Sequence, residues 1–212
     1  MKIAICVPTR GNDIYYKLML FCCAESRKGH DIISFPCNGG AAISQTKLFD
    51  AVLIGGYDGM FLIDSDVCPP DNALDVLIGH RLDIISVPTL MTSGKDVHWN
   101  YHMDPDSRRI YSPRQNSGIT EVVFTSFASV LIGAQVLREF KRRGESWFGM
   151  SDLVPAHLHD GIVSNGLTDH AFFNKARAMG FKIFMNWNLR NAVHHKYMAL
   201  DDQCFVREIG NT

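Results

Sequence analysis

The chain lacks an excess of basic residues. Its 21 Lys and Arg residues are balanced by 22 Asp and Glu residues, so the formal net charge is −1. A protein that binds the nucleic-acid backbone needs a basic excess to neutralise phosphates, and the composition therefore argues against nucleic acid as a partner. With 46% hydrophobic and 20% charged residues among 212, the chain has the ordinary composition of a globular protein with a sizeable core.

Long apolar runs and metal-type cysteine pairs are also missing. No run approaches the roughly 18–20 residues of a membrane-spanning helix, so no membrane span is expected. The apolar run at residues 2–7 is too short for a signal peptide and is typical of a strand. None of the six cysteines has C-x-x-C spacing, which favours reduced thiols in a reducing compartment and predicts a cytoplasmic protein.

The first 90 residues alternate between short apolar runs and segments with helical spacing, with a repeat of about 25 residues. Strands followed by helices in this order are typical of an α/β fold with a mainly parallel sheet. The glycines that follow the helical segments are plausible stops. The predicted strands cover 2–7, 30–35, 59–63 and 83–87, and the predicted helices cover 14–28, 41–54 and 69–80.

The later part of the chain has a weaker pattern. Residues 89–119 are polar and irregular, with a hairpin expected to turn at Asp104-Pro105-Asp106. The loop 145–167 has the character of a substrate-facing segment, and the basic end of the helix before it is expected to be solvated. Further strands are predicted at 121–124, 129–132 and 181–185, further helices at 134–143 and 168–179, and residues 189–195 lead to paired histidines.

The most informative motif is Asp64-Ser65-Asp66, which directly follows the apolar strand 59–63. In open α/β folds, ligands bind at the carboxyl ends of the strands, where this pair stands. Carboxylate oxygens suit Mn²⁺ or Mg²⁺, and such an ion bridges to phosphates of a substrate. The motif therefore predicts a metal and diphosphate site; the alternative is that the two acids cap the next helix or occupy a polar turn.

Two further segments carry candidate chemistry. His194 and His195 are adjacent on a strand, so their side chains point to opposite faces and at most one faces a given site. We favour His194 as a third metal ligand and keep His195 as the alternate. Asp169 opens a helix, where it either stabilises the helix start or serves as a general base.

Other candidates are weighed against plain structural roles. Pro8-Thr9-Arg10 follows the first strand at the same predicted sheet edge as Asp64, where it would border a nucleotide; a plain turn is the alternative. Trp147-Phe148 stacks on a sugar or closes the core. Residues that line an acceptor groove, or simply pack in a loop, are His98, Trp99, Tyr101 and His102.

Taken in order, these residues resemble small glycosyltransferases with the GT-A architecture, of the family-2-like type that viruses and phages encode. The chain also looks similar to the glycosyltransferase domain that chlorella viruses use on capsid glycans. The resemblance spans nearly the whole chain. It rests on the segments Ile5 to Gly11, Phe61 to Asp66, Ser146 to Phe148, Thr168 to Phe173 and Ala176 to Ile183, and on the closing His194.

The resemblance implies one GT-A domain over 1–212, with a nucleotide-binding half at about 1–90 and an acceptor half, including the metal-binding histidine, at about 91–212. Asp64 and Asp66 would hold Mn²⁺ or Mg²⁺ against the diphosphate of a nucleotide sugar, with Ser65 beside the donor and His194 completing the protein ligands. Pro8, Thr9 and Arg10 would border the nucleoside. The family favours a uridine diphosphate donor and a glycan or protein-linked acceptor. If the protein is viral, its location is the host cytoplasm.

The sequence departs from the family pattern at two places. Many inverting members keep an acidic pair where this chain has Thr168-Asp169, which leaves Asp169 as the single candidate base and the stereochemistry open. Members often carry an arginine in the helix before the Asp-x-Asp strand, and here Gln45 and Lys47 stand in that neighbourhood as candidate donor contacts.

Two other classes compete with the transferase. A phosphohydrolase uses Asp-x-Asp as nucleophile and acid on Mg²⁺, but such enzymes usually place the pair on the first strand, and here it follows two predicted helices. The second class is a catalytically inactive nucleotide- or carbohydrate-binding domain. Turnover of a nucleotide sugar that is lost on Asp66→Ala would separate the transferase from both.

Overall fold

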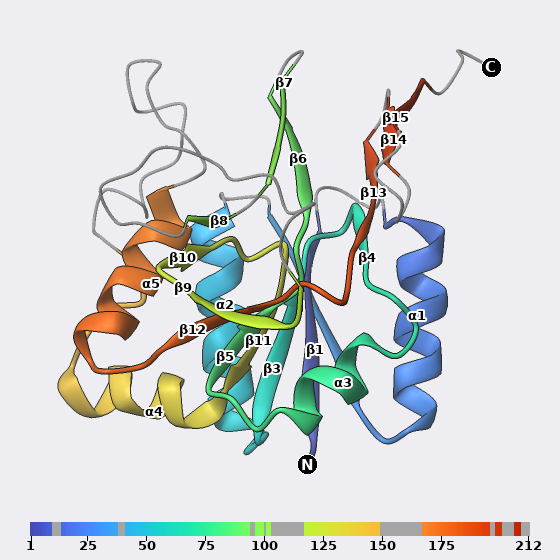
Figure 1. The fold of residues 1–212 in the computed structure, drawn as a ribbon. Helices are drawn as coiled ribbons and strands as arrows, with labels where there is room; N and C mark the ends of the chain where they lie inside the picture. Colours follow the sequence, from blue (N-terminus) through green and yellow to red (C-terminus); the bar gives the residue numbers. More distant parts are fainter. Residues whose placement is uncertain are drawn as a thin grey trace.

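A seven-stranded sheet with helices on both faces forms the centre of the fold (Figure 1). The computed structural model describes residues 1–9, 14–37, 41–93, 96–99, 101–102, 117–148, 167–195, 198–200 and 206–208. Within these ranges, no helix is long and apolar enough to cross a lipid bilayer.

The strand order in the main sheet is β2-β1-β3-β11-β5-β12-β9. Strands β1, β2, β3, β5 and β12 run in one direction, whereas β11 and β9 run against them. The predicted α/β fold with a mainly parallel sheet is therefore confirmed. The bounds are β1 Ile3–Thr9, β2 Asp31–Pro36, β3 Gly59–Ile63, β5 Ile84–Ser86, β9 Ile119–Val122, β11 Ser129–Gly133 and β12 Ile183–Asn186.

Antiparallel strand β11 lies between β3 and β5, which are the third and fourth predicted strands of the first 90 residues. Its five residues are all buried, and it pairs along its whole length with β3, from Ser129↔Ile63 to Gly133↔Gly59. A strand from the second part of the chain thus sits in the middle of the sheet that the first part begins. The division into a nucleotide-binding and an acceptor half stays a prediction.

The five helices within the described ranges fall into two sets by the face of the sheet that they cover. Because side chains alternate along a strand, neighbouring residues such as Ile5 and Cys6 enter different cores. Helices α1 Tyr16–Arg27 and α3 Ala73–Gly79 pack on the side of Ile5, and helices α2 Ala41–Ile54, α4 Ala134–Arg143 and α5 Leu167–Ala178 pack on the side of Cys6. All five coincide with predicted helices to within four residues at each end.

Helix α4 shows why the predicted ends were accurate. Gly144 adopts a left-handed conformation (φ 68°), and its backbone N–H donates to the carbonyl of Lys141 at 3.1 Å. Glycine accepts this conformation without the steric cost that a Cβ would bring. The basic end of α4 is solvated, as predicted, and both Arg142 and Arg143 pair with Glu139.

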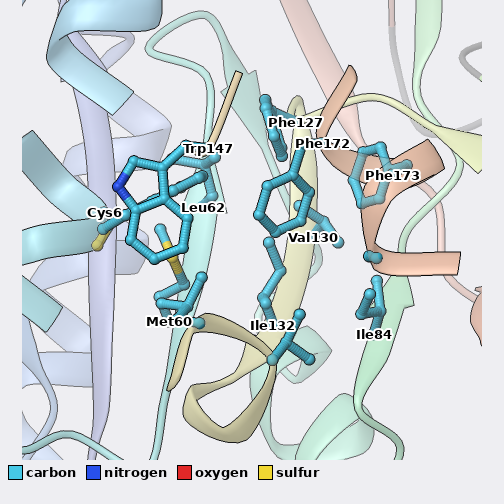
Figure 2. Packing of buried hydrophobic residues seen from close by; sticks show 14 of the residues in the cluster. Cys6, Met60, Leu62, Ile84, Phe127, Val130, Ile132, Trp147, Phe172 and Phe173 are labelled. Atoms are coloured by element: carbon cyan, nitrogen blue, oxygen red, sulfur yellow. The ribbon is translucent and has the colours of Figure 1, made fainter. Parts of the chain in front are cut away.

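The core on the α2, α4 and α5 side is rich in aromatic rings (Figure 2). Phe172 stacks on Phe140 with ring centroids 4.8 Å apart, and Trp147 lies 5.4 Å from Phe49. Trp147 and Phe148 are 5% and 1% exposed. Of the two interpretations of this dipeptide, the structure therefore supports core packing, because a buried indole cannot stack on a sugar.

Smaller sheets extend from the carboxyl edge of the main sheet (Figure 1). Residues 89–119 were expected to be irregular, yet β6 Leu90–Ser93 and β7 Asp96–Trp99 form a hairpin. The hairpin predicted at Asp104 to Asp106 lies outside the described residues. The other short strands are β4 Val67–Cys68, β8 Tyr101–His102, β10 Phe124–Thr125, β13 Ala192–His195, β14 Met198–Leu200 and β15 Val206–Glu208.

Candidate functional site

The acidic motif forms a tight turn at the carboxyl end of β3. The backbone N–H of Asp64 donates to the carbonyl of Ala128 at 3.0 Å, and the N–H of Val67 donates back to the carbonyl of Asp64 at 3.0 Å. The carbonyl of Ser65 accepts the N–H of Tyr15 at 2.9 Å. Two other segments of the chain and one hydrogen bond within the turn thus hold its backbone, and Asp64, Ser65 and Asp66 are all half-buried.

The end of β1 lies next to this turn. Strands β1 and β3 are parallel and pair from Ile3↔Gly59 to Cys6↔Leu62, so their carboxyl ends, near Pro8 and Asp64, lie at the same edge of the sheet. Pro8 and Thr9 are buried, and the carbonyl of Thr9 accepts the N–H of Cys37 at 2.7 Å. The structure therefore brings Pro8 and Thr9 to the acidic edge, while Arg10 lies outside the described residues.

Gln45 and Lys47 occupy different environments on α2. Residues two apart on a helix do not share a face, and Gln45 is 4% exposed whereas Lys47 is exposed. The neighbour Ser44 places its Oγ 3.1 Å from Cys37 Sγ, just after β2, so this turn of α2 lies near the carboxyl edge of the sheet. Oε1 of Gln45 has no hydrogen-bond partner among the described residues. Gln45 and Lys47 therefore lie on different sides of α2, and their role as donor contacts stays a prediction.

The two histidines reach the acidic turn through strand pairing. Strand β13 pairs antiparallel with β4, with Ala192 opposite Cys68 and Val193 opposite Val67. The pairing ends at Val193 and Val67, each one residue away along the chain from His194 and Asp66, respectively. The side chains of β13 are not described. Among the side chains that are described, no group of three His, Cys, Asp or Glu gathers as a metal site.

Asp169 lies in the first turn of α5 and is tied to the chain that precedes β11. Its Oδ2 accepts the backbone N–H of Phe127 at 3.0 Å. The next residue, His170, stacks on Phe124 with ring centroids 3.7 Å apart and ring planes 6° from parallel. These two contacts fix the start of α5 against the segment that joins β10 to β11.

That same segment lies beside part of the predicted acceptor groove. Strand β10 pairs antiparallel with β8, with Phe124 opposite His102 and Thr125 opposite Tyr101. The residues that pair with β8, Phe124 and Thr125, precede Phe127 by three and two positions in the sequence. Phe127 is the hydrogen-bond partner of Asp169. His98 and Trp99 lie on β7, and the side chains of these four groove candidates are not described.

Sequence reasoning missed a set of buried polar contacts behind this edge. Ser86 Oγ lies 2.7 Å from Thr125 Oγ1 and donates to the carbonyl of Ser129 at 3.0 Å. Asn191 Nδ2 donates to Thr89 Oγ1 at 2.6 Å. The sequence signal for these contacts was a serine or threonine at the end of an apolar run. A buried hydroxyl group nearly always has a hydrogen-bond partner, so such a residue indicates a polar contact in the core. These contacts connect β5 with β10, β11 and the approach to β13.

Two surface hollows in the described part of the chain lie elsewhere. One of about 480 Å³ is bordered by Glu121, Arg177 and Lys182, and one of about 460 Å³ is bordered by Asp58, Arg81 and Arg138. Both open at the amino-terminal end of the parallel strands, and neither contains a predicted site residue. A large pocket is the default candidate for a site. In this fold, however, the carboxyl ends of β1 and β3 are the better candidate, because ligands bind at the carboxyl edge of such sheets.

Comparison with protein-family models and with curated proteins gives no match. Solved structures do match. A197 from STIV superposes with a TM-score of 0.68 at 13% identity, over 100% of this chain and 96% of that one. S. aureus TarS (residues 1–349) superposes with a TM-score of 0.52 at 13% identity, over 90% of this chain and 59% of that one. At this level of identity the likeness shows the fold alone, and this chain shares the mixed α/β fold of these two structures.

Proposed function

We propose that the protein is a metal-dependent glycosyltransferase that moves a sugar from a nucleotide diphosphate sugar, with a uridine diphosphate donor favoured, to a glycan or protein-linked acceptor. The observation that carries the proposal is the β4–β13 register. It pairs β13, from the far end of the chain, with the strand that directly follows the acidic turn, and the last pair, Val193 and Val67, stands one residue from His194 and from Asp66. The fold neighbours support the same class of reaction.

The acidic turn fits a divalent cation. Proteins commonly hold Mg²⁺ through one or two carboxylates while substrate phosphates supply further ligands, and Mn²⁺ prefers similar oxygen donors. Asp64 and Asp66 offer two half-buried carboxylates within one turn, and His194 is the third protein ligand in this proposal. When bound, Mn²⁺ or Mg²⁺ would neutralise the negative charge that develops on the diphosphate leaving group.

The remaining roles belong to the chain's own residues. Pro8, Thr9 and Gln45 would border the nucleoside, together with Arg10, and Ser65 would lie beside the diphosphate. Asp169 would take the proton from the acceptor hydroxyl or stabilise positive charge on the sugar ring. The Phe127 N–H holds one oxygen of this carboxylate.

The function is tested by donor turnover with a matched pair of variants. The wild-type protein is screened for release of nucleoside diphosphate from nucleotide sugars with Mn²⁺, with Mg²⁺ and with a chelator. Asp66→Asn should abolish metal-dependent turnover, because the neutral amide is a much weaker metal ligand. Asp71→Asn, which removes an exposed carboxylate five residues away, should leave turnover unchanged.

Thermal stability gives a second readout. A true donor raises the melting temperature by mass action, and the rise should be larger with Mn²⁺ and lost in Asp66→Asn. Release of phosphate from simple monoesters would instead indicate the phosphohydrolase. Binding of a nucleotide sugar without turnover of any acceptor would indicate a non-catalytic binding domain. If no nucleotide shifts the transition under any metal condition, the donor proposal is wrong.

A further inference from the structure

The outer side of helix α1 exposes large apolar side chains. Tyr16, Met19 and Leu20 are 63%, 53% and 65% exposed, and Cys23 on the same helix is also exposed. The four residues follow the spacing i, i+3, i+4 and i+7, which places them along one stripe of an α-helix. They form what we call the α1 stripe.

The fold itself does not use the α1 stripe. The residues of α1 that are buried against the sheet are Leu18, Phe21, Cys22 and Glu25. At 3.6 residues per turn, the stripe lies on the opposite side of the helix from these four. Figure 1 shows α1 at the outer margin of the molecule, where it contacts β4. A contiguous apolar stripe that points away from the core is unusual on a soluble surface and indicates a contact with another partner.

The exposed charges that α1 itself carries are of one sign. Lys17 and Arg27 are exposed and form no ion pair with a described residue. Lys28, at the C-cap, pairs with Glu25 at 2.8 Å and with Asp75 at 2.7 Å. Glu25 is the only acid on α1 and is fully buried. The exposed surface of α1 therefore combines apolar side chains with cations and presents no exposed acid.

We propose that α1 docks on an anionic lipid surface, with the α1 stripe inserted at the boundary between headgroups and acyl chains and with Lys17 and Arg27 against the headgroups. Helices that lie in the membrane interface pair a hydrophobic face with Lys and Arg in this way, and Tyr favours the same depth. Lipid charge complements the cations of α1, whereas a second copy would bring like charges together.

The size of the stripe also favours a lipid surface over a second copy. A stable dimer needs roughly 800 Å² per partner, from about 20–30 residues a side. Four side chains on one helix fall well short of that, while membrane binding accumulates from a few inserted side chains plus charge. Because Tyr15 at the N-cap of α1 bonds to Ser65, docking would hold the acidic turn close to the lipid surface.

The proposal does not depend on the transferase activity and is tested without a donor. The full chain is floated with vesicles of phosphatidylcholine alone and with vesicles that also contain phosphatidylglycerol. We expect binding to the anionic vesicles, weaker binding to the neutral ones, and a decline with added salt. Met19→Ser combined with Leu20→Ser should weaken binding by about tenfold or more, and Lys17→Gln and Arg27→Gln should each weaken it about fivefold.

The matched control is Ile54→Ser, which removes a side chain that is 87% exposed at the end of α2 and should leave vesicle binding unchanged. Circular dichroism verifies that each variant folds, and sedimentation velocity reports the oligomeric state. The proposal is overturned if the wild-type protein ignores anionic vesicles, or if the double variant binds them as well as the wild type does. A wild-type dimer that the double variant converts to a monomer, without vesicle binding, would assign the stripe to a second copy and also overturn it.

Discussion

The backbone N–H of Phe127 donates a hydrogen bond of 3.0 Å to Oδ2 of Asp169 and so joins the start of α5 to the segment before β11. This contact gives Asp169 a fixed position relative to β11, which pairs with the strand that carries the acidic turn. The asparagine oxygen can accept the same N–H, so an Asp169→Asn substitution changes the charge and leaves the anchoring contact in place.

The first prediction concerns this substitution. Asp169→Asn should lower kcat for transfer by about 10²- to 10⁴-fold, because an amide cannot act as a general base. KM for the donor and the melting temperature should stay close to the wild-type values. Steady-state kinetics with both substrates and a thermal melt check the prediction. A variant that keeps most of the wild-type kcat would exclude Asp169 as the base.

The second prediction separates the two histidines. His194→Ala should weaken Mn²⁺ binding by about tenfold or more, since it removes an imidazole ligand, while His195→Ala should leave the affinity within a small factor of the wild type. The physical reason is the β4–β13 pairing, whose last pair, Val193 and Val67, stands one residue from His194 and from Asp66 but two residues from His195. Isothermal titration with Mn²⁺ measures both. The opposite ranking would assign the ligand role to His195.

The third prediction concerns the buried contact between Asn191 and Thr89. Thr89→Val keeps the side-chain shape but removes the oxygen that accepts from Asn191 Nδ2 at 2.6 Å. We expect the free energy of unfolding to fall by about 1–3 kcal/mol, because a buried donor loses its closest acceptor. Urea denaturation measures the loss. Ser34→Ala, at an exposed position of edge strand β2, is the control and should change stability little.

The fourth prediction tests the position of Trp147. The ring is 5% exposed and packs 5.4 Å from both Phe49 and Phe140. Trp147→Ala should destabilise the protein by about 3–5 kcal/mol. The milder Trp147→Phe should lower stability without changing KM for the donor. A raised KM in a stably folded Trp147→Phe protein would instead support a contact with the sugar.

The fifth prediction follows from thiol burial. Burial raises the pKa of Cys22 to about 12 and that of Cys68 to about 11, and only the thiolate reacts with alkylating reagents. At pH 8 both thiols should therefore label slowly, and their rates should rise as the pH approaches these values. Exposed Cys23 should label quickly, and Cys23→Ser should remove that fast reaction. Mass spectrometry of the peptides assigns each site; rapid labelling of Cys22 in Cys23→Ser would contradict the burial.

Local signals explain which parts of the fold were predictable. Helix α4 ends where Gly144 takes a left-handed conformation that only glycine adopts freely. Strand β3 is an unbroken buried run that stops before Asp64. Because an unpaired carboxylate is almost never fully buried, the strand is expected to end there. Such features depend on neighbouring residues, and so the elements and the candidate acidic edge could be predicted before any tertiary contact was known.

The missed features depend on residues far apart in the chain. The sequence of β11 does not indicate that this strand inserts antiparallel between β3 and β5. The identity of Trp147 as a tryptophan does not indicate whether its side chain faces solvent or the core. The β6–β7 hairpin was overlooked because each of its strands has only four residues and lies in a stretch that is polar as a whole. Burial and pairing partners are decided by packing against distant segments, which a local pattern does not contain.

By itself, the sequence determined an α/β chain whose apolar strands end in polar and acidic residues, because hydrophobic spacing and turn chemistry act over a few residues. Only the tertiary structure decided which of those ends meet. The pairing of β13 with β4 ends one residue from His194 and from Asp66, the Phe127 N–H positions Asp169, and the packing of α1 leaves an apolar stripe facing outward. The reason is that strand register and helix orientation depend on which faces are buried against segments far away in the chain. Those contacts exist only once the chain has folded.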